Sequence, residues 1–152
     1  MKIFLVQHGQ TVPEEIDPEK PLSPDGREEI EKIARFLAQR SFPLSFILHS
    51  QKLRTKQTAE IMGEALNPKA TIKEFRDLGP HDALGPILKR IEGEDRDFMI
   101  VGHLPFLNRL VGELLVSDEK AELIHFEKGK TVCLMQSNGN WVIDWVLGVH
   151  QL

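Results

Sequence analysis

Residues 3–11 read Ile-Phe-Leu-Val-Gln-His-Gly-Gln-Thr. The apolar residues Ile3 to Val6 stop abruptly at Gln7 and His8, a pattern typical of a buried strand that presents a histidine at its carboxyl end. Gly9 then leaves the backbone free to turn. Active sites of open α/β sheets form where parallel strands end in this way. One such histidine is weak evidence, so the argument depends on what the rest of the chain brings to the same place.

Two later apolar runs end in a similar manner. Phe46 to Leu48 is followed by His49-Ser50, and Phe98 to Val101 is followed by Gly102-His103. Between and after these runs, apolar residues recur at helical spacing. This periodicity predicts four helices, centred on residues 30–37, 58–66, 84–91 and 107–115.

Capping residues and prolines mark where these helices begin. Ser23 or Asp25 can cap the first helix, and Asp82 is expected to cap the third. Pro86 is tolerated in the third helix because it lies in the first turn, and Pro105 opens the fourth helix. Residues 67–96 are therefore expected to hold a loop and one helix.

The end of the chain has a different pattern. Thr131 to Gln136 and Trp141 to Leu147 have the composition of strands, and the intervening Ser-Asn-Gly-Asn is a good hairpin turn. The order strand-helix-strand-helix-helix-strand-helix-strand-strand predicts the α/β class. We expect a three-layer α/β/α sandwich, with a mostly parallel sheet and an antiparallel C-terminal hairpin at its edge. Residues 1–152 should form a single domain.

Composition excludes several classes of function. A net charge of −4 argues against nucleic-acid binding, so an anionic ligand would need a local basic site. The single cysteine, Cys133, lies in a strand-like run and is expected to be a buried, unreactive thiol. The six histidines show no metal-binding spacing, and we expect neither a metal nor a cofactor. No targeting or membrane-spanning segment is present, so we expect a cytoplasmic protein without a membrane partner.

Phosphoryl transfer is the chemistry that fits the predicted strand ends. Parallel strands linked by helices end at one edge of a sheet, so His8, Arg54 and His103 should converge there. A neutral imidazole can attack phosphorus at pH 7, and a guanidinium offers a fork of donors to phosphoryl oxygens. Helix N-termini directly after each strand would add backbone donors for an anion.

Four segments carry a family pattern, and they occur in family order. They are Gln7-His8-Gly9, Pro21-Leu22-Ser23-Pro24-Asp25-Gly26, Ser50-Gln51-Lys52-Leu53-Arg54-Thr55-Lys56-Gln57-Thr58-Ala59 and Gly102-His103-Leu104-Pro105. Together they resemble the histidine phosphatase superfamily (phosphoglycerate mutase-like), and within it the short SixA-type phosphohistidine phosphatases. Two positions depart from the family pattern: Gln7 stands where the family has arginine, and Gln51 where it has proline.

The resemblance implies roles for individual residues. His8 would be the nucleophile that forms a phosphohistidine intermediate, which water then hydrolyses. Arg54 would hold the phosphoryl group, and His103 would be a second donor to it. Four further residues would contribute to substrate binding: Gln7, Gly9, Thr11 and Ser50.

The expected substrate follows from what the chain lacks. Larger relatives insert an acidic general acid between the second and third strands, whereas residues 67–96 are short. Phosphohistidine has a good leaving group and depends less on such an acid. We therefore expect hydrolysis of phosphohistidine on a signalling or phosphotransfer protein. The alternatives are a phosphatase of small phosphate esters, with Asp82 or Glu74 as proton donor, and a phosphate-binding protein of low activity because Gln7 has replaced the arginine.

Overall fold

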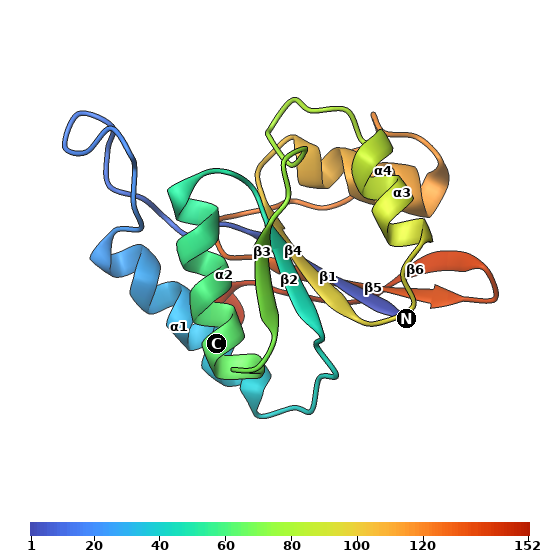
Figure 1. Cartoon of the computed structure of the whole chain (residues 1–152), viewed down its shortest axis with the longest axis horizontal. Coiled ribbons are helices and arrows are strands. Elements are labelled where there is room, and N and C mark those ends of the chain that lie inside the picture. The colour runs from blue at the N-terminus through green and yellow to red at the C-terminus, as the bar shows by residue number, and fades with distance from the viewer.

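Six strands form one sheet in the computed structural model, which describes residues 1–152 (Figure 1). They are β1 (Lys2–Gln7), β2 (Phe46–His49), β3 (Thr71–Glu74), β4 (Phe98–Gly102), β5 (Thr131–Ser137) and β6 (Asn140–Leu147). Their order across the sheet is β3-β2-β4-β1-β5-β6. β3, β2, β4 and β1 run parallel to one another, whereas β5 pairs antiparallel with both β1 and β6. The predicted mixed sheet is thereby confirmed.

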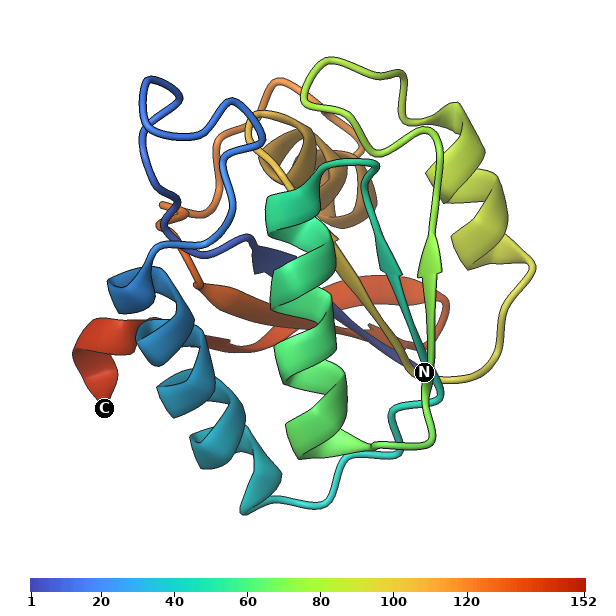
Figure 2. The same ribbon diagram turned by 60° about the vertical axis from the view of Figure 1, so that its left-hand side comes forward.

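Helices cover both faces of this sheet. They are α1 (Pro24–Ala38), α2 (Leu53–Leu66), α3 (Gly85–Glu92) and α4 (Phe106–Val116), followed by the short 3-10 helix η1 (Val149–Gln151). α1 and α2 lie side by side on one face, and α3 and α4 lie on the other (Figures 1 and 2). The three-layer α/β/α sandwich predicted from the sequence is confirmed. None of the helices combines the length and the apolar character needed to cross a membrane.

Alternation along the central strand divides the core into two halves. Ile3 and Leu5 of β1 pack toward α3 and α4, whereas Phe4 and Val6 pack toward α1 and α2. All four side chains are buried, because β1 lies between β4 and β5 with helices on both sides. A strand buried on both faces is a continuous apolar run, which is why β1 was recognisable in the sequence. Cys133 belongs to the α1–α2 half, where burial raises the pKa of its thiol to about 12.

The start of α1 explains the Pro-Leu-Ser-x-x-Gly segment. The Ser23 hydroxyl accepts a hydrogen bond from the Gly26 backbone N–H at 3.0 Å, so Ser23 rather than Asp25 is the N-cap. The Ser23 N–H in turn donates to the carbonyl of Gln10 at 2.9 Å. A Cβ atom at position 26 would lie only 2.1 Å from that same carbonyl oxygen. Glycine is therefore needed for α1 to pack against the loop that follows β1.

Two expectations for residues 67–96 were wrong. Thr71–Glu74 forms β3, a parallel edge strand paired with β2, in a segment where only a loop and a helix were predicted. Asp82 does not cap α3: Leu84 is the N-cap residue, and the Asp82 carboxylate accepts a hydrogen bond from the Gly79 N–H at 2.7 Å. The sequence signal failed at β3 because an edge strand of four mostly exposed residues carries no apolar run.

The C-terminal hairpin follows its prediction. β5 and β6 are joined by Asn138 and Gly139, both with positive φ (52° and 81°). A two-residue hairpin turn needs this conformation, which Asn-Gly adopts at little cost. The hairpin matters for the site because β5 pairs with β1, and the segment before β5 therefore lies at the carboxyl end of β1.

Candidate active site

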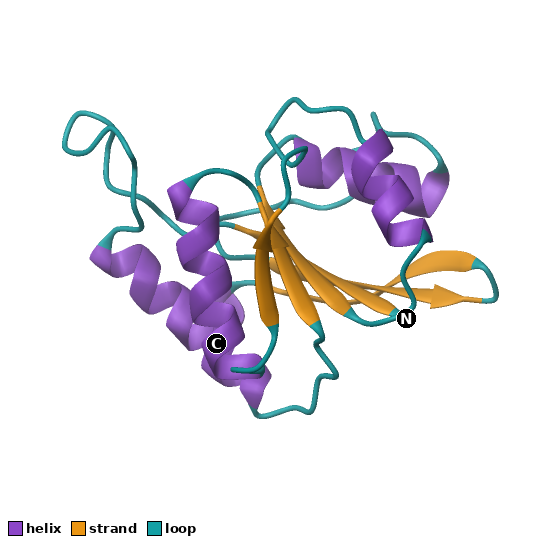
Figure 3. Cartoon of the chain, in the orientation of Figure 1, coloured by secondary structure: helices purple, strands orange, loops and turns teal.

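The three predicted strand ends meet at one edge of the sheet. His8 follows β1, Ser50 follows β2 and His103 follows β4. These ends lie together at the upper end of the sheet in Figure 3. The rings of His8 and His103 are 5.2 Å apart between centroids, with 62° between their planes. Both histidines are buried, so the structure brings together the two residues on which the sequence interpretation rests.

Hydrogen bonding fixes the tautomer of His8. Its Nδ1 lies 2.8 Å from the carbonyl oxygen of Gly9. Because a carbonyl only accepts, Nδ1 carries the proton and Nε2 keeps a free lone pair in the neutral ring. The pKa of His8 is lowered to about 3, mainly by burial and against a smaller rise from the Gly9 hydrogen bond. The positive charges of Lys128 and Arg54 and the His103 ring also contribute to this lowering. At pH 7 His8 is therefore a neutral imidazole whose Nε2 lone pair is available for nucleophilic attack.

A chain of hydroxyl groups holds His103. The Thr55 hydroxyl lies 2.7 Å from the Lys52 carbonyl, so Thr55 must donate there. The Ser50 hydroxyl, 2.8 Å away, then donates to Thr55 Oγ1. Ser50 Oγ is thereby left to accept from His103 Nε2 at 2.7 Å. The proton of neutral His103 therefore lies on Nε2, held by a network with no exposed member except Lys52.

Positive charges surround the two histidines. Burial, together with the charges of nearby cations, lowers the pKa of His103 to about 4. Four basic side chains act in this way, in order of decreasing effect: Arg54, Lys128, Lys52 and Lys20. None of these cations forms an ion pair with a carboxylate. In a chain with a net charge of −4, this local excess of unpaired cations is suited to an anionic ligand.

Arg54 lies in the first turn of α2, directly after β2. Its side chain is half-buried, and this burial lowers the pKa of its guanidinium, which stays protonated. α4 likewise begins soon after β4. The expectation that a helix follows each strand directly is wrong for β1, because α1 begins only at Pro24.

Two residues of the Arg-x-x-Gln-Thr-Ala segment connect the segments that carry the family pattern to one another. Thr58 Oγ1 accepts a hydrogen bond from the Gly9 N–H at 3.1 Å and donates to the Arg54 carbonyl at 2.8 Å. The Gln57 side-chain carbonyl accepts from the Leu22 N–H at 2.7 Å. The sequence placed Thr58 only on the buried side of a helix. Its position in the motif was the available signal for this positioning role.

The residues expected to bind substrate lie in different environments. Gln7 is buried, and its side-chain Oε1 has no hydrogen-bond partner. The Gly9 N–H is occupied by Thr58, and Ser50 is hydrogen-bonded to His103. Thr11 forms an isolated antiparallel bridge with Leu22. Substrate binding by these four residues stays a prediction.

The candidate proton donors lie outside the histidine pair. Glu74 is the exposed last residue of β3, and the Asp82 carboxylate accepts from Gly79. Neither carboxylate has a hydrogen bond or ion pair with His8 or His103. No cluster of side chains able to hold a metal ion is present.

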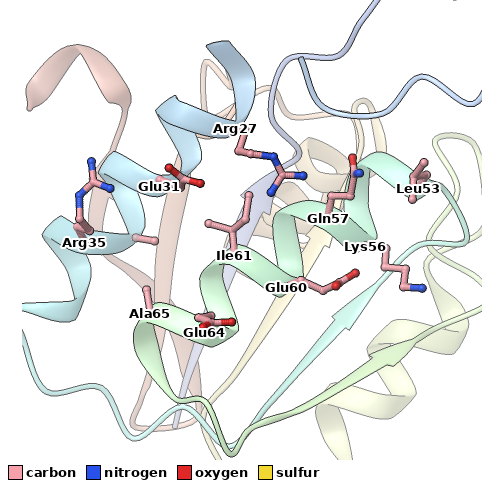
Figure 4. Close-up of a pocket in the computed structure, with 11 residues that line it drawn as sticks. Arg27, Glu31, Arg35, Leu53, Lys56, Gln57, Glu60, Ile61, Glu64 and Ala65 are labelled. Carbon is pink, nitrogen blue, oxygen red and sulfur yellow. The ribbon is translucent and has the colours of Figure 1, made fainter. Parts of the chain in front are cut away.

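A groove of about 520 Å³ lies away from this site, between α1 and α2. Figure 4 shows side chains of both signs along it, including Arg27 and Arg35 from α1 and Glu60 and Glu64 from α2. None of the residues that line it is a histidine, and the mixed charges resemble an ordinary solvated helix surface. The histidine pair, and not this groove, is therefore the candidate active site.

Known proteins match this chain in sequence. The family model for the histidine phosphatase superfamily (branch 1) matches residues 3–79. Phosphohistidine phosphatase SixA of Escherichia coli (strain K12) is 26% identical over 150 residues, which cover 95% of this chain and 92% of that protein.

Solved structures match the fold over nearly the whole chain. Protein histidine phosphatase SixA in complex with tungstate aligns with a TM-score of 0.86 at 23% identity, covering 99% of both chains. A phosphoserine phosphatase variant of Entamoeba histolytica in complex with phosphoserine aligns with a TM-score of 0.76 at 12% identity, covering 99% of this chain and 98% of that one. The chain thus belongs to the histidine phosphatase superfamily and is a phosphatase.

Proposed function

We propose that this chain removes the phosphoryl group from phosphohistidine on a signalling or phosphotransfer protein. The observation that carries the proposal is the state of His8. It is a buried, neutral imidazole with Nε2 free, and it faces a second histidine among unpaired cations. A neutral nitrogen nucleophile in a cationic site suits an anionic phosphoryl group.

The reaction has two steps. In the first, the Nε2 lone pair of His8 forms a bond to phosphorus while the phosphorus–nitrogen bond of the substrate breaks. The substrate ring, protonated on its other nitrogen, takes the electron pair of that bond and leaves as a neutral imidazole. In the second step, water attacks phosphorus, the bond to His8 Nε2 breaks, and orthophosphate is released. The His8 Nδ1–H stays on the Gly9 carbonyl throughout, which keeps the ring oriented.

Arg54 and His103 stabilise the phosphoryl group in this proposal. The Arg54 guanidinium offers paired donors to the equatorial oxygens, where negative charge lies in the transition state. The single N–H of neutral His103 is donated to Ser50, which sets the orientation of the ring, so His103 becomes the second donor when its ring is protonated, a state that the charge of a bound phosphoryl group favours. A preorganised hydrogen-bond donor costs no reorganisation at the moment of reaction.

The nature of the leaving group favours phosphohistidine over a phosphate ester. The ordinary pKa of imidazole is about 6.5, so a departing imidazole needs little assistance from an acid. An alkoxide leaving group needs a proton donor, yet neither Asp82 nor Glu74 bonds to the histidine pair. The SixA relative is a phosphohistidine phosphatase by name, whereas the Entamoeba histolytica relative is a phosphoserine phosphatase. The substrate therefore has to be decided by turnover.

The test compares wild type with His8→Ala on a phosphotransfer protein that carries phosphohistidine. We expect wild type to release orthophosphate and to carry acid-labile phosphate on His8 during turnover. His8→Ala should do neither, and full activity of this variant would exclude the mechanism. A panel of metabolite phosphates run in parallel tests the ester alternative, which predicts faster turnover of one of them. Binding of orthophosphate without any turnover would favour the phosphate-binding alternative.

A further inference from the structure

We propose that Lys128 binds the phosphoryl group in this site and supplies the positive charge that Gln7 lacks. The inference rests on the proposed function and adds a residue to its phosphoryl-binding set. Lys128 lies in the loop before β5, outside every motif that the sequence analysis singled out. Three independent features of the structure support this role.

The first feature is how the Lys128 loop is attached. The Gly129 N–H donates to the Gln7 carbonyl at 2.9 Å and approaches the His8 carbonyl at 3.3 Å. The Gln7 N–H donates to the Lys130 carbonyl at 3.2 Å. Gly129 has a φ of +80°, a conformation that glycine adopts readily. Lys128 is therefore fixed beside the backbone of the proposed nucleophile, although 120 residues separate them in the sequence.

The second feature is the contrast between the two lysines that flank Gly129. The Lys130 ammonium donates to the His125 carbonyl and lies 3.4 Å from a carboxylate oxygen of Glu127. Lys128 has no carboxylate partner. Burial lowers the pKa of Lys128, and the charges of Arg54 and Lys20 lower it further. Three cations that act on one another and have no carboxylate partner are suited to binding an anion.

The third feature is the charge that reaches His8. Among the charged groups that lower the pKa of His8, Lys128 has the largest effect, ahead of His103 and Arg54. Gln7, the immediate neighbour of His8, carries no charge, and its buried Oε1 is unpartnered. The family pattern has arginine at that position. Lys128, in the loop before β5, provides a cation at the carboxyl end of β1, where the family has the arginine.

The test is a double-mutant cycle between positions 7 and 128. The proteins are wild type, Lys128→Met, Gln7→Arg and the double variant Gln7→Arg/Lys128→Met. A hydrogen bond to a charged group predicts that Lys128→Met lowers both kcat/KM for phosphohistidine protein and affinity for orthophosphate by about 10- to 100-fold. In the Gln7→Arg background the same change should cost at most about threefold, because the guanidinium supplies the charge.

Two further variants separate charge from structure. Lys128→Arg keeps the cation and should retain activity within about threefold. Lys56→Met removes an exposed lysine of α2 that faces the α1–α2 groove, and it should leave both measurements unchanged. The inference is overturned if Lys128→Met loses nothing, or loses the same factor in both backgrounds. Failure of the proposed function is distinguishable from failure of this inference. In that case wild type and all variants at position 128 would show no phosphohistidine on His8.

Discussion

Strands β1 and β2 end in nearly identical local structures. Each delivers a histidine that is 5% exposed. His8 Nδ1 lies 2.8 Å from the carbonyl of Gly9, and His49 Nδ1 lies 2.7 Å from the carbonyl of Ser50. In both rings Nδ1 therefore carries the proton and Nε2 keeps the lone pair in the neutral form. Sequence pattern, burial and tautomer do not distinguish these two histidines.

Their neighbours distinguish them. His8 packs against His103 and lies among the charges of Arg54 and Lys128. His49 is paired in the sheet with Glu74 of β3 and Val101 of β4, and no second histidine ring stacks on it. The comparison teaches that the strand-end histidine is a common local solution. Of the two, only His8 lies among cations from other parts of the chain, and this distinguishes it as the candidate nucleophile.

The strongest way to break the comparison is to remove each histidine in turn. We expect His8→Ala to lower turnover of phosphohistidine protein by on the order of 10³-fold or more, because the nucleophile is lost. His49→Ala should keep turnover within about threefold, while the free energy of unfolding falls by about 1–3 kcal/mol from the unsatisfied Ser50 carbonyl. Phosphate release and urea unfolding measure the two effects. Equal losses of turnover in both variants would mean that the neighbours do not select His8.

The next effect is expected at Ser50, which links the end of β2 to the His8 site. Ser50→Ala leaves the buried His103 Nε2–H without its acceptor. We expect kcat/KM to fall about 10-fold, and the free energy of unfolding to fall by about 1–3 kcal/mol. Thr55→Ser is the matched control, because it keeps the hydroxyl that accepts from Ser50. An unchanged kcat/KM in Ser50→Ala would show that His103 needs no such positioning.

The comparison also shows what a sequence can and cannot predict in this fold. β1, β2 and β4 were predictable because strands buried on both faces are continuous apolar runs. β3 was not, because Thr71, Lys73 and Glu74 are exposed at the sheet edge and leave no pattern. Edge strands depend on pairing with a neighbour, and this pairing is a tertiary property.

The same division applies to the site. His8 and His103 were predictable, since consecutive parallel strands must end at one edge. Lys128 was not, because it reaches His8 through the antiparallel pairing of β5 with β1. The Ser50–Thr55 relay was also missed, because the direction of its protons follows from distances and not from residue type. Motifs carry local chemistry, whereas the surrounding charge is set by topology.

Acid should lower the stability of the folded protein, because the two site histidines are buried in their neutral form. The folded-state pKa is about 3 for His8 and about 4 for His103, both below the ordinary value of 6.5. Below pH 6.5 both histidines therefore bind protons in the unfolded chain but stay neutral in the folded protein. Stability should be full above pH 6.5 and fall as the pH drops toward 4, with a loss of about 2 kcal/mol for each histidine at pH 5.

Urea unfolding between pH 7.5 and pH 5 measures this loss. In His8→Asn one of the two groups is removed, so the decline between those pH values should be shallower by about 2 kcal/mol. Lys56→Met serves as a control, because Lys56 is not among the charges that act on either histidine. An undiminished decline in His8→Asn would mean that His8 is protonated as easily as an exposed histidine.

The smallest effect is expected at Asp82, which tests whether turnover at His8 needs a carboxylic acid as proton donor. Asp82→Asn removes a carboxylic proton but keeps an oxygen that can accept from the Gly79 N–H. Turnover of phosphohistidine protein should stay within about threefold, because imidazole is a good leaving group. Glu74→Gln, at the exposed end of β3, is the matched control and should behave alike. A tenfold loss confined to Asp82→Asn would assign proton donation to the segment before α3. It would also shift the choice of substrate toward phosphate esters, whose alkoxide leaving groups need that proton.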